Sequence, residues 1–128
     1  MKNVFTLLGA MKAAQHANRT KIILALNTTG LTFLQYLKRK NLILHYTRRE
    51  NNIYEIFLKR GVYGFLFKEI IAHSNTKKIC LSHKALQTST QYSPFARIIL
   101  LTPFGFMEFR EALLNRTGGT PVCTIKLL

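Results

Sequence analysis

The chain has 128 residues with 19 Lys and Arg against five acids, all of them Glu, so its formal net charge is +14 at pH 7. A hydrophobic content of 48% excludes a disordered basic tail, and two cysteines are too few for a disulfide framework. The apolar runs are only a few residues long, so we expect no membrane span.

The N-terminal third predicts a helix, a strand and a second helix. Residues 3–19 carry apolar side chains at the spacing of an amphipathic helix. The stripe consists of Val4, Leu7, Leu8, Met11 and Ala14. Residues 21–26 are an Ile-rich run that predicts a strand. We expect Thr28 or Thr29 to cap the following helix, and Asn41 to end it in the αL conformation.

The middle of the chain predicts a hairpin followed by a less regular segment. Residues 42–48 and 53–59 flank a polar turn sequence, which is typical of a β-hairpin. Gly61 and Gly64 mark the next turn. Residues 67–73 are short and apolar, and either helix or strand would suit them.

The C-terminal half predicts mainly strands with one short helix. We expect strands at residues 78–82, 97–102 and 122–127, a loop at 83–94 and a helix at 107–115. The sum is an α+β protein of two small lobes. Residues 1–65 would form an N-terminal α/β lobe, and residues 66–128 a C-terminal, mainly β lobe.

The excess of positive charge indicates the kind of partner that the protein binds. Excess cations on a folded domain repel one another, and a polyanionic partner removes that cost. Nucleic acid is therefore the first candidate. An anionic membrane surface is the second, but it favours one long helix with a basic face, whereas these cations are spread along the whole chain. A basic enzyme without such a partner is the remaining interpretation.

Metal binding has little support in the sequence. Cys80 and His83 stand at Cys-x2-His spacing, with His73 upstream and Cys123 far downstream. A lone Cys in an apolar strand is more often a small buried hydrophobe than a ligand. We therefore expect no metal and no cofactor.

Enzyme activity has little support either. Glu108 and Glu111 could act as an acid–base pair, but acids in a first helical turn also complement the helix dipole. Gly61 and Gly64 match the G-x-x-G string of a KH loop, yet the flanking helices are not evident. No P-loop, dinucleotide fingerprint or nucleophile elbow is present. We expect no catalysis and no small-molecule substrate.

Two glycine-containing loops in the last third are the best candidates for a binding site. The turn after residues 97–102 and the loop with Gly118 and Gly119 are expected to be adjacent. Glycines let backbone N–H groups approach a phosphate or sugar closely, and the hydroxyl of Thr102 or Thr120 could bond a ribose or base edge. The alternative is a β lobe in which Gly-Gly merely turns the chain.

Short motifs follow one another in this region. They are Thr102-Pro103-Phe104-Gly105-Phe106-Met107, Arg110-Glu111-Ala112, Gly118-Gly119 and Val122-Cys123. At closely similar spacing, they resemble the Ser-Thr-Ser-Lys-Gly-Val-Met/Leu, Arg-Glu/Ala-Ala, Gly-Gly-Glu and Cys pattern of the small-subunit ribosomal protein number eight family, of bacterial and organellar type. The first helix and the segment around residues 37–43 are also similar, and the match is colinear over residues 2–126.

The resemblance implies two α+β lobes, no enzyme activity, and binding to the central domain of small-subunit rRNA beside neighbouring small-subunit ribosomal proteins. It also implies that the C-terminal lobe, residues 66–128, binds this rRNA, and that the two glycines turn the backbone sharply beside it. We expect positive φ there, because only glycine adopts it freely. With nearby cations added, the expected RNA contacts are Lys12, Arg19, Lys21, Leu101, Thr102, Pro103, Phe104, Gly105, Arg110, Gly118, Gly119 and Thr120.

The sequence also departs from the family pattern. Leu101 and Pro103 replace two serines, Phe104 replaces a lysine, and Thr120 replaces the acid of Gly-Gly-Glu. Pro103 has no N–H to donate. Polar reading of the RNA minor groove is thereby reduced, and Phe104 could instead stack on a splayed base or contact a protein.

Residues with AT-rich codons are favoured, and together with the altered loop this favours a mitochondrial ribosome; a plastid ribosome or the bacterial cytoplasm are the alternatives. A free-standing basic regulator that binds nucleic acid is the alternative function. Co-sedimentation with small ribosomal subunits would separate the two functions.

Overall fold

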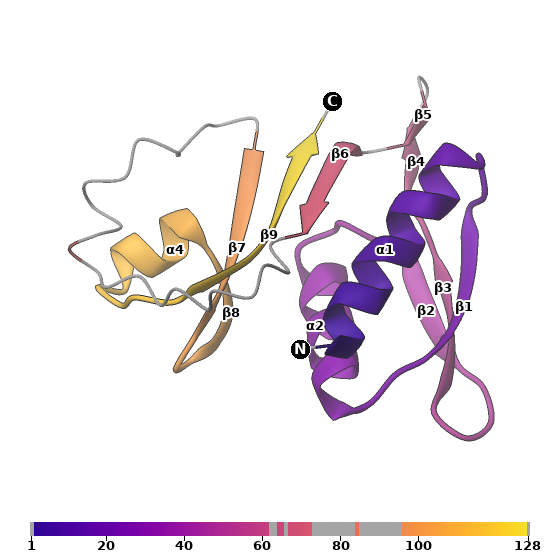
Figure 1. Ribbon diagram of the computed structural model, residues 1–128, viewed down its shortest axis with the longest axis horizontal. Helices are drawn as coiled ribbons and strands as arrows, with labels where there is room; N and C mark the ends of the chain where they lie inside the picture. Colours follow the sequence, from indigo (N-terminus) through magenta and orange to yellow (C-terminus); the bar gives the residue numbers. More distant parts are fainter. Residues whose placement is uncertain (1, 62–63, 66, 73–83, 85–95, 128) are drawn as a thin grey trace. The chain divides into compact units, whose positions relative to one another are not determined.

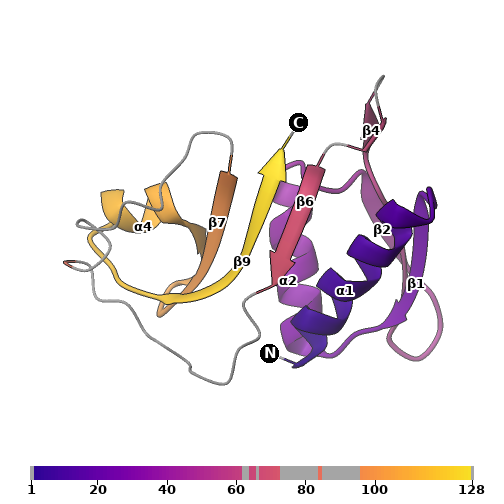
Figure 2. The same ribbon diagram turned by 45° about the horizontal axis from the view of Figure 1, so that its top comes forward.

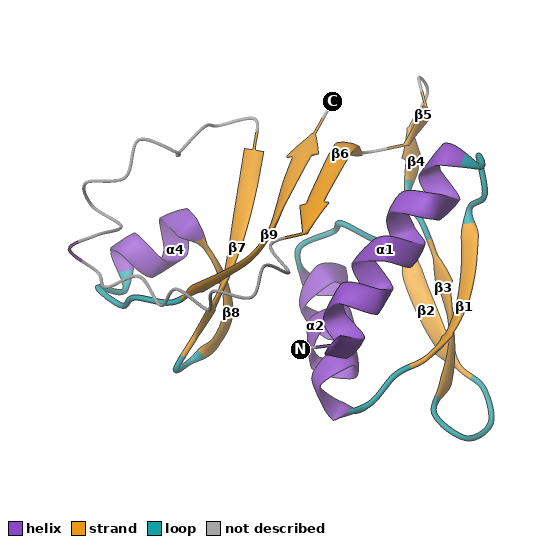
Figure 3. Cartoon of the chain, in the orientation of Figure 1, coloured by secondary structure: helices purple, strands orange, loops and turns teal. Residues whose placement is uncertain are grey.

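The computed structural model describes residues 2–61, 64–65, 67–72, 84 and 96–127. Helices and antiparallel sheets occur together, so the fold is α+β, as the sequence predicts (Figure 3). The chain divides into two compact units, Met1–Leu66 (unit 1) and Phe67–Leu128 (unit 2).

Unit 1 is a three-stranded sheet with two helices on one face (Figures 1 and 2). Its main elements are α1 (Lys2–His16), β1 (Lys21–Ala25), α2 (Thr28–Arg39), β2 (His45–Arg48) and β3 (Ile53–Phe57). The strand order is β1-β3-β2, and both pairings are antiparallel. The central strand β3 therefore pairs with a strand that precedes α2 and with one that follows it.

The apolar stripe of α1 forms much of the core of unit 1, as predicted. Val4, Leu7, Leu8 and Met11 are at most 1% exposed. The helix ends at His16, three residues before the expected end at residue 19. It ends there because Asn18 adopts φ 54°, and the backbone N–H of residue 19 turns back to the Ala14 carbonyl.

The predicted N-cap of α2 is wrong. Asn27, not Thr28 or Thr29, is the N-cap, and its side-chain oxygen accepts a 2.9 Å hydrogen bond from the Gly30 N–H. A second asparagine, Asn3 in α1, accepts a 2.7 Å bond from the Asn27 N–H. The expected αL end is confirmed, since the residue after Lys40 has φ 59°.

The predicted hairpin is confirmed in β2 and β3. Asn51 and Asn52 both have positive φ, as a type I′ turn between twisted strands requires. Strand β2 begins at His45, later than the expected residue 42. After β3, β4 (Arg60–Gly61) pairs with β5 (Gly64–Phe65). The G-x-x-G string thus joins two strands and does not lie between helices as in a KH loop.

Unit 2 is a four-stranded antiparallel sheet that carries one short helix. Its elements are β6 (Phe67–Ala72), β7 (Ala96–Thr102), β8 (Gly105–Glu108), α4 (Phe109–Leu114) and β9 (Thr120–Leu127). The strand order is β6-β9-β7-β8, so the last strand of the chain lies inside the sheet. The expected strand at 78–82, and the expected loop at 83–94 except residue 84, lie outside the described residues.

Two expected boundaries in unit 2 are corrected. The helix begins at Phe109 and not at residue 107, because Met107 is still paired with Leu100 in the sheet. The last strand begins at Thr120 and not at residue 122. Pro121 is tolerated inside it because the β7–β9 register shifts there, opposite Leu100, and β6 pairs only from residue 123 onward.

Helix α4 packs on β7. The cluster consists of Ile98, Leu100, Phe109 and Ala112, with Leu113 against it. The first turn is closed by the Glu111 carboxylate, which accepts a 3.4 Å hydrogen bond from the Glu108 N–H. The two glutamates therefore form a capping box at the helix start. The packing anchors the residues that connect β8 to β9.

Candidate nucleic-acid interface

The turn between β7 and β8 is closed by one buried hydroxyl. Thr102 is 6% exposed, and its Oγ1 donates a 2.8 Å hydrogen bond to the Gly105 carbonyl. The same oxygen accepts a 3.2 Å bond from the Phe104 N–H. Because both bonds lie within the turn, the hydroxyl of Thr102 organises the turn, a role that the sequence did not predict.

The closed turn presents an aromatic ring to solvent. Phe104 is 74% exposed, and Pro103 beside it is exposed as well. Gly105 has φ 108°, a conformation that side chains other than that of glycine rarely adopt. The glycine requirement in this turn is therefore at Gly105.

The second predicted loop lies directly beside this turn. Leu101 pairs with Thr120, and a Cβ placed on Gly119 would lie 3.0 Å from the Thr102 methyl group. The expected adjacency of the two loops is confirmed. We call the surface that Pro103, Phe104, Gly118 and Thr120 form the turn-end surface.

The reason for glycine at position 119 differs from the expected one. Gly119 is buried and does not have positive φ. A Cβ there would lie 2.9 Å from the Leu101 carbonyl oxygen and 3.2 Å from the Leu100 Cβ. The close approach that requires glycine is to the neighbouring strand of the same unit.

One arginine lies within α4 and another lies just after it. Arg110, a predicted contact, is exposed in the first turn of the helix. Arg116, which the sequence reading did not select, is exposed just after the helix and has φ 53°. The signal that could have found it is its position where a helix ends, three residues before Gly119.

The carboxylates of unit 2 lie away from the turn-end surface. Glu108, opposite Ile99, is 3.6 Å from the Arg97 guanidinium. Glu69 is 3.5 Å from Lys126 at the end of β9 remote from Thr120. Glu111 caps the start of α4. Among the described residues, no carboxylate belongs to the turn, to the loop before Gly119 or to the first residues of β9.

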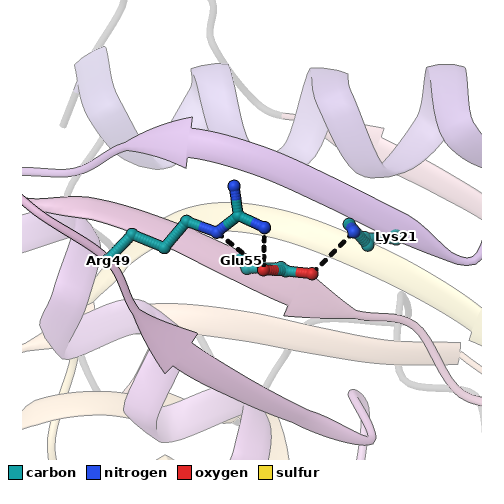
Figure 4. A network of polar contacts seen from close by, with 3 residues as sticks. All are labelled: Lys21, Arg49 and Glu55. Carbon is teal, nitrogen blue, oxygen red and sulfur yellow. Dashed lines mark hydrogen bonds and ion pairs between the residues drawn. The ribbon is translucent and has the colours of Figure 1, made fainter.

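In unit 1, Lys21 belongs to an internal ion network (Figure 4). Its Nζ is 2.7 Å from one carboxylate oxygen of Glu55, and Arg49 contacts the other oxygen at 2.6 Å. Figure 4 shows the carboxylate between the two cations. Hydrogen bonding to Lys21, and then to Arg49, lowers the pKa of Glu55 although burial opposes this shift. Lys21 therefore balances an acid of its own sheet.

The other cations of unit 1 are distributed over two elements. Lys12 on α1 and Arg19 just after it are exposed, as a contact with RNA requires. At the end of α2, Lys38 lies 5.5 Å from the ring centre of Tyr46, and the Arg39 guanidinium lies 5.5 Å from that of Tyr36. The predicted set did not include these two cations. The spacing of Tyr36 and Arg39 on one helix could have indicated the second contact, whereas the contact of Lys38 with Tyr46 depends on the fold.

The remaining candidate groups can be placed only in part. Cys123 is buried in β9, opposite Ile99, and burial raises the pKa of its thiol to about 12. Cys80, His73 and His83 lie outside the described residues. Across the described part of the chain, no three His, Cys, Asp or Glu side chains gather as metal ligands would.

Among the described residues, no helix has both the length and the apolar character that a membrane span requires. Comparison of the sequence with protein-family models finds no match, and comparison with curated proteins finds none either.

Proposed function

We propose that this protein is a structural, non-enzymatic constituent of a small ribosomal subunit. It binds the central domain of small-subunit rRNA through the turn-end surface, and it adjoins neighbouring small-subunit ribosomal proteins. The observation that carries the proposal is the juxtaposition of the two motif segments on which the family resemblance rests. Residues 102–105 and Gly119, separated along the chain, meet at one end of the unit 2 sheet.

Electrostatics support an RNA partner. Unit 1 contains 11 Lys and Arg against two Glu, and unit 2 contains eight against three. Three of the glutamates already pair with cations of their own unit: Glu55, Glu69 and Glu108. The remaining positive charge has no internal counterpart of comparable size. A polyanion that brings many phosphates relieves this repulsion and releases its counterions.

The turn chemistry defines how such a contact is made. Thr102 is engaged inside the turn and Pro103 lacks an N–H, so the usual hydroxyl and amide contacts are reduced. The groups that can meet RNA are the exposed Phe104 ring and the partly exposed Gly118. The protein therefore contacts RNA here by shape and apolar surface more than by hydroxyl hydrogen bonds.

Sedimentation tests the ribosomal assignment. Tagged protein expressed in its own cells is expected to migrate with small subunits in a sucrose gradient. Crosslinking from position 104 is expected to mark small-subunit rRNA. Protein that stays at the top of the gradient and crosslinks to messenger RNA or DNA would instead establish the free-standing regulator and refute the proposal.

The salt dependence of RNA binding tests the electrostatic argument separately. If about six phosphates are neutralised, raising salt from 50 to 200 mM lowers affinity by roughly a thousandfold. Filter binding with a transcript of the rRNA central domain measures this slope. A flat dependence would contradict the proposal.

The proposed location is a mitochondrial ribosome, on the grounds that residues encoded by AT-rich codons are abundant and that the turn differs from the family pattern. Fractionation of cells into mitochondria, plastids and cytosol, followed by immunodetection, tests it. Detection only in plastid or bacterial cytoplasmic ribosomes would correct the location and leave the ribosomal function intact.

A further inference from the structure

Phe104 is 74% exposed, and it lies in a turn that hydrogen bonds hold in place. The Thr102 hydroxyl makes both hydrogen bonds that close the turn. Gly119, the residue before β9, leaves no room for a side chain beside the same threonine. Because the backbone that carries the ring is held before binding, contact with a ligand orders little more than the side chain itself, and an exposed aromatic ring is suited to stacking.

Arg116 is the second unusual residue near this end of the unit. Helices α1, α2 and α4 end in the same way. The N–H of an αL residue donates to the carbonyl three positions earlier, and the N–H of the residue after it donates to the carbonyl five positions earlier. In α1 and α2, the αL residue is an asparagine, Asn18 or Asn41, which tolerates that conformation. In α4 it is Arg116, which has no such advantage.

The position of Arg116 links it to the turn. Gly119 contacts Thr102 and lies three residues further along the chain, and three residues span at most about 10 Å. The arginine side chain therefore starts near the turn-end surface. The described residues between Arg116 and Gly119, and those of the turn itself, include no carboxylate to neutralise it.

We propose that Phe104 and Arg116 form a nucleotide-binding pair: the Phe104 ring stacks on an unpaired base, and the Arg116 guanidinium binds a backbone phosphate beside it. The inference rests on the proposed function in taking the RNA to be small-subunit rRNA. It names the part of that RNA that is bound, an unstacked nucleotide in a loop or bulge. Single-stranded sites recognised in this way combine aromatic stacking with cationic contacts to the backbone.

A protein partner fits this surface less well. The chain carries a net charge of +14, and the phosphates of RNA offset this charge better than a protein surface of mixed charge does. A protein anchor is nevertheless a distinct outcome of the test, because it would tolerate an aliphatic side chain at position 104.

The stacking half of the proposal is tested with two RNA octamers, an oligoadenylate and an abasic octamer with the same phosphates. The full-length protein is expected to bind the oligoadenylate more tightly, because only that octamer offers bases. Phe104→Ala should weaken oligoadenylate binding by roughly five- to 150-fold and leave abasic binding unchanged. Phe104→Trp should retain the preference, whereas Phe104→Leu should lose it.

Leu114→Ala is the matched control, since Leu114 is 75% exposed in the same unit but lies on α4. It should bind both octamers as the natural protein does. Equal binding of the two octamers by the natural protein, or a full preference retained in Phe104→Leu, would overturn base stacking; the second result would establish a simple apolar anchor.

The phosphate half is tested with Arg116→Asn. This variant should melt roughly 2–4 °C higher, because asparagine suits the αL position better. It should also bind both octamers more weakly, with a salt slope smaller by about 0.7, the value for one phosphate of a single strand. Opposite signs for stability and affinity exclude a merely structural role for Arg116.

Lys126→Gln is the control for loss of one charge, because Lys126 pairs with Glu69 at the opposite end of β9. An equal slope change in both variants would overturn the assignment to Arg116.

The octamer results are independent of sedimentation. Subunit association without a Phe104 effect refutes this inference alone, whereas a Phe104 effect without subunit association refutes the ribosomal function alone.

Discussion

The two units place their few acids differently. In unit 1, Glu55 lies on the central strand of the sheet and is held between Lys21 and Arg49. In unit 2, Glu69 and Glu108 pair with cations away from the turn. In a chain with 19 cations and five acids, the positions of the acids decide where positive charge remains for a partner. Unit 1 neutralises one of its predicted contacts, while unit 2 leaves its turn-end surface without an acid.

Gly119→Val is expected to have the largest effect on stability, and this effect is expected in unit 2. A side chain there meets the Leu101 carbonyl at 2.9 Å, and backbone cannot move aside cheaply. We expect a loss of about 3 kcal/mol in the unfolding free energy. Chemical denaturation followed by circular dichroism measures it.

The matched control is Gly9→Ala in α1, where a Cβ meets nothing within 4 Å. It should stabilise unit 1 by about 0.5–1 kcal/mol, because alanine loses less backbone entropy in a helix. Equal stability of Gly119→Val and the natural protein would show that the close packing of Gly119 is not important.

Thr102→Val tests how strongly one hydroxyl holds the turn. The substitution keeps the shape but removes both hydrogen bonds, to the Gly105 carbonyl and from the Phe104 N–H. We expect unit 2 to lose about 1–2 kcal/mol. Hydrogen exchange of the Phe104 amide should also accelerate, since it would have no acceptor. Unchanged exchange would contradict the role given to this hydroxyl.

Acid titration tests how much the ion network around Glu55 stabilises unit 1. The pKa of Glu55 is lower in the folded protein than in the unfolded chain, so the stabilisation is complete above the unfolded value near 4.5 and is lost as pH falls through the folded value. Thermal unfolding between pH 6 and pH 2 should show this loss. Glu55→Gln should flatten that part of the profile, and an unaltered profile would contradict the assignment.

The smallest expected effect is at Cys123, where burial raises the pKa of the thiol to about 12. At pH 8 almost no thiolate is present, so iodoacetamide should not modify this residue in the folded protein. A Cys80→Ser variant leaves Cys123 as the sole thiol for mass spectrometry. Rapid modification without denaturant would show that the strand opens readily.

Patterns that depend on near neighbours were read correctly from the sequence. The apolar stripe of α1 is buried because a helix places residues three and four apart on one face, whatever it packs against. The αL residue Asn41 and the polar hairpin turn were also recognised, because their backbone preferences are local. Competition between local options explains the errors: Asn27 was the better cap, and residues 105–108 joined the sheet before the helix began.

The sequence by itself determined the charge excess, the α+β class, most elements and the adjacency expected for the two glycine loops. Only the tertiary structure decided that Lys21 is neutralised by Glu55, that the Thr102 hydroxyl faces inward, and that Gly119 is required by a neighbouring strand. The physical reason is that the Lys21–Glu55 contact and the close approach of Gly119 to Leu101 join distant segments, whose register strand pairing sets. The Thr102 contacts depend on how the turn closes once both of its strands are paired. Local preference cannot specify which side chains a sheet will bring within hydrogen-bond distance.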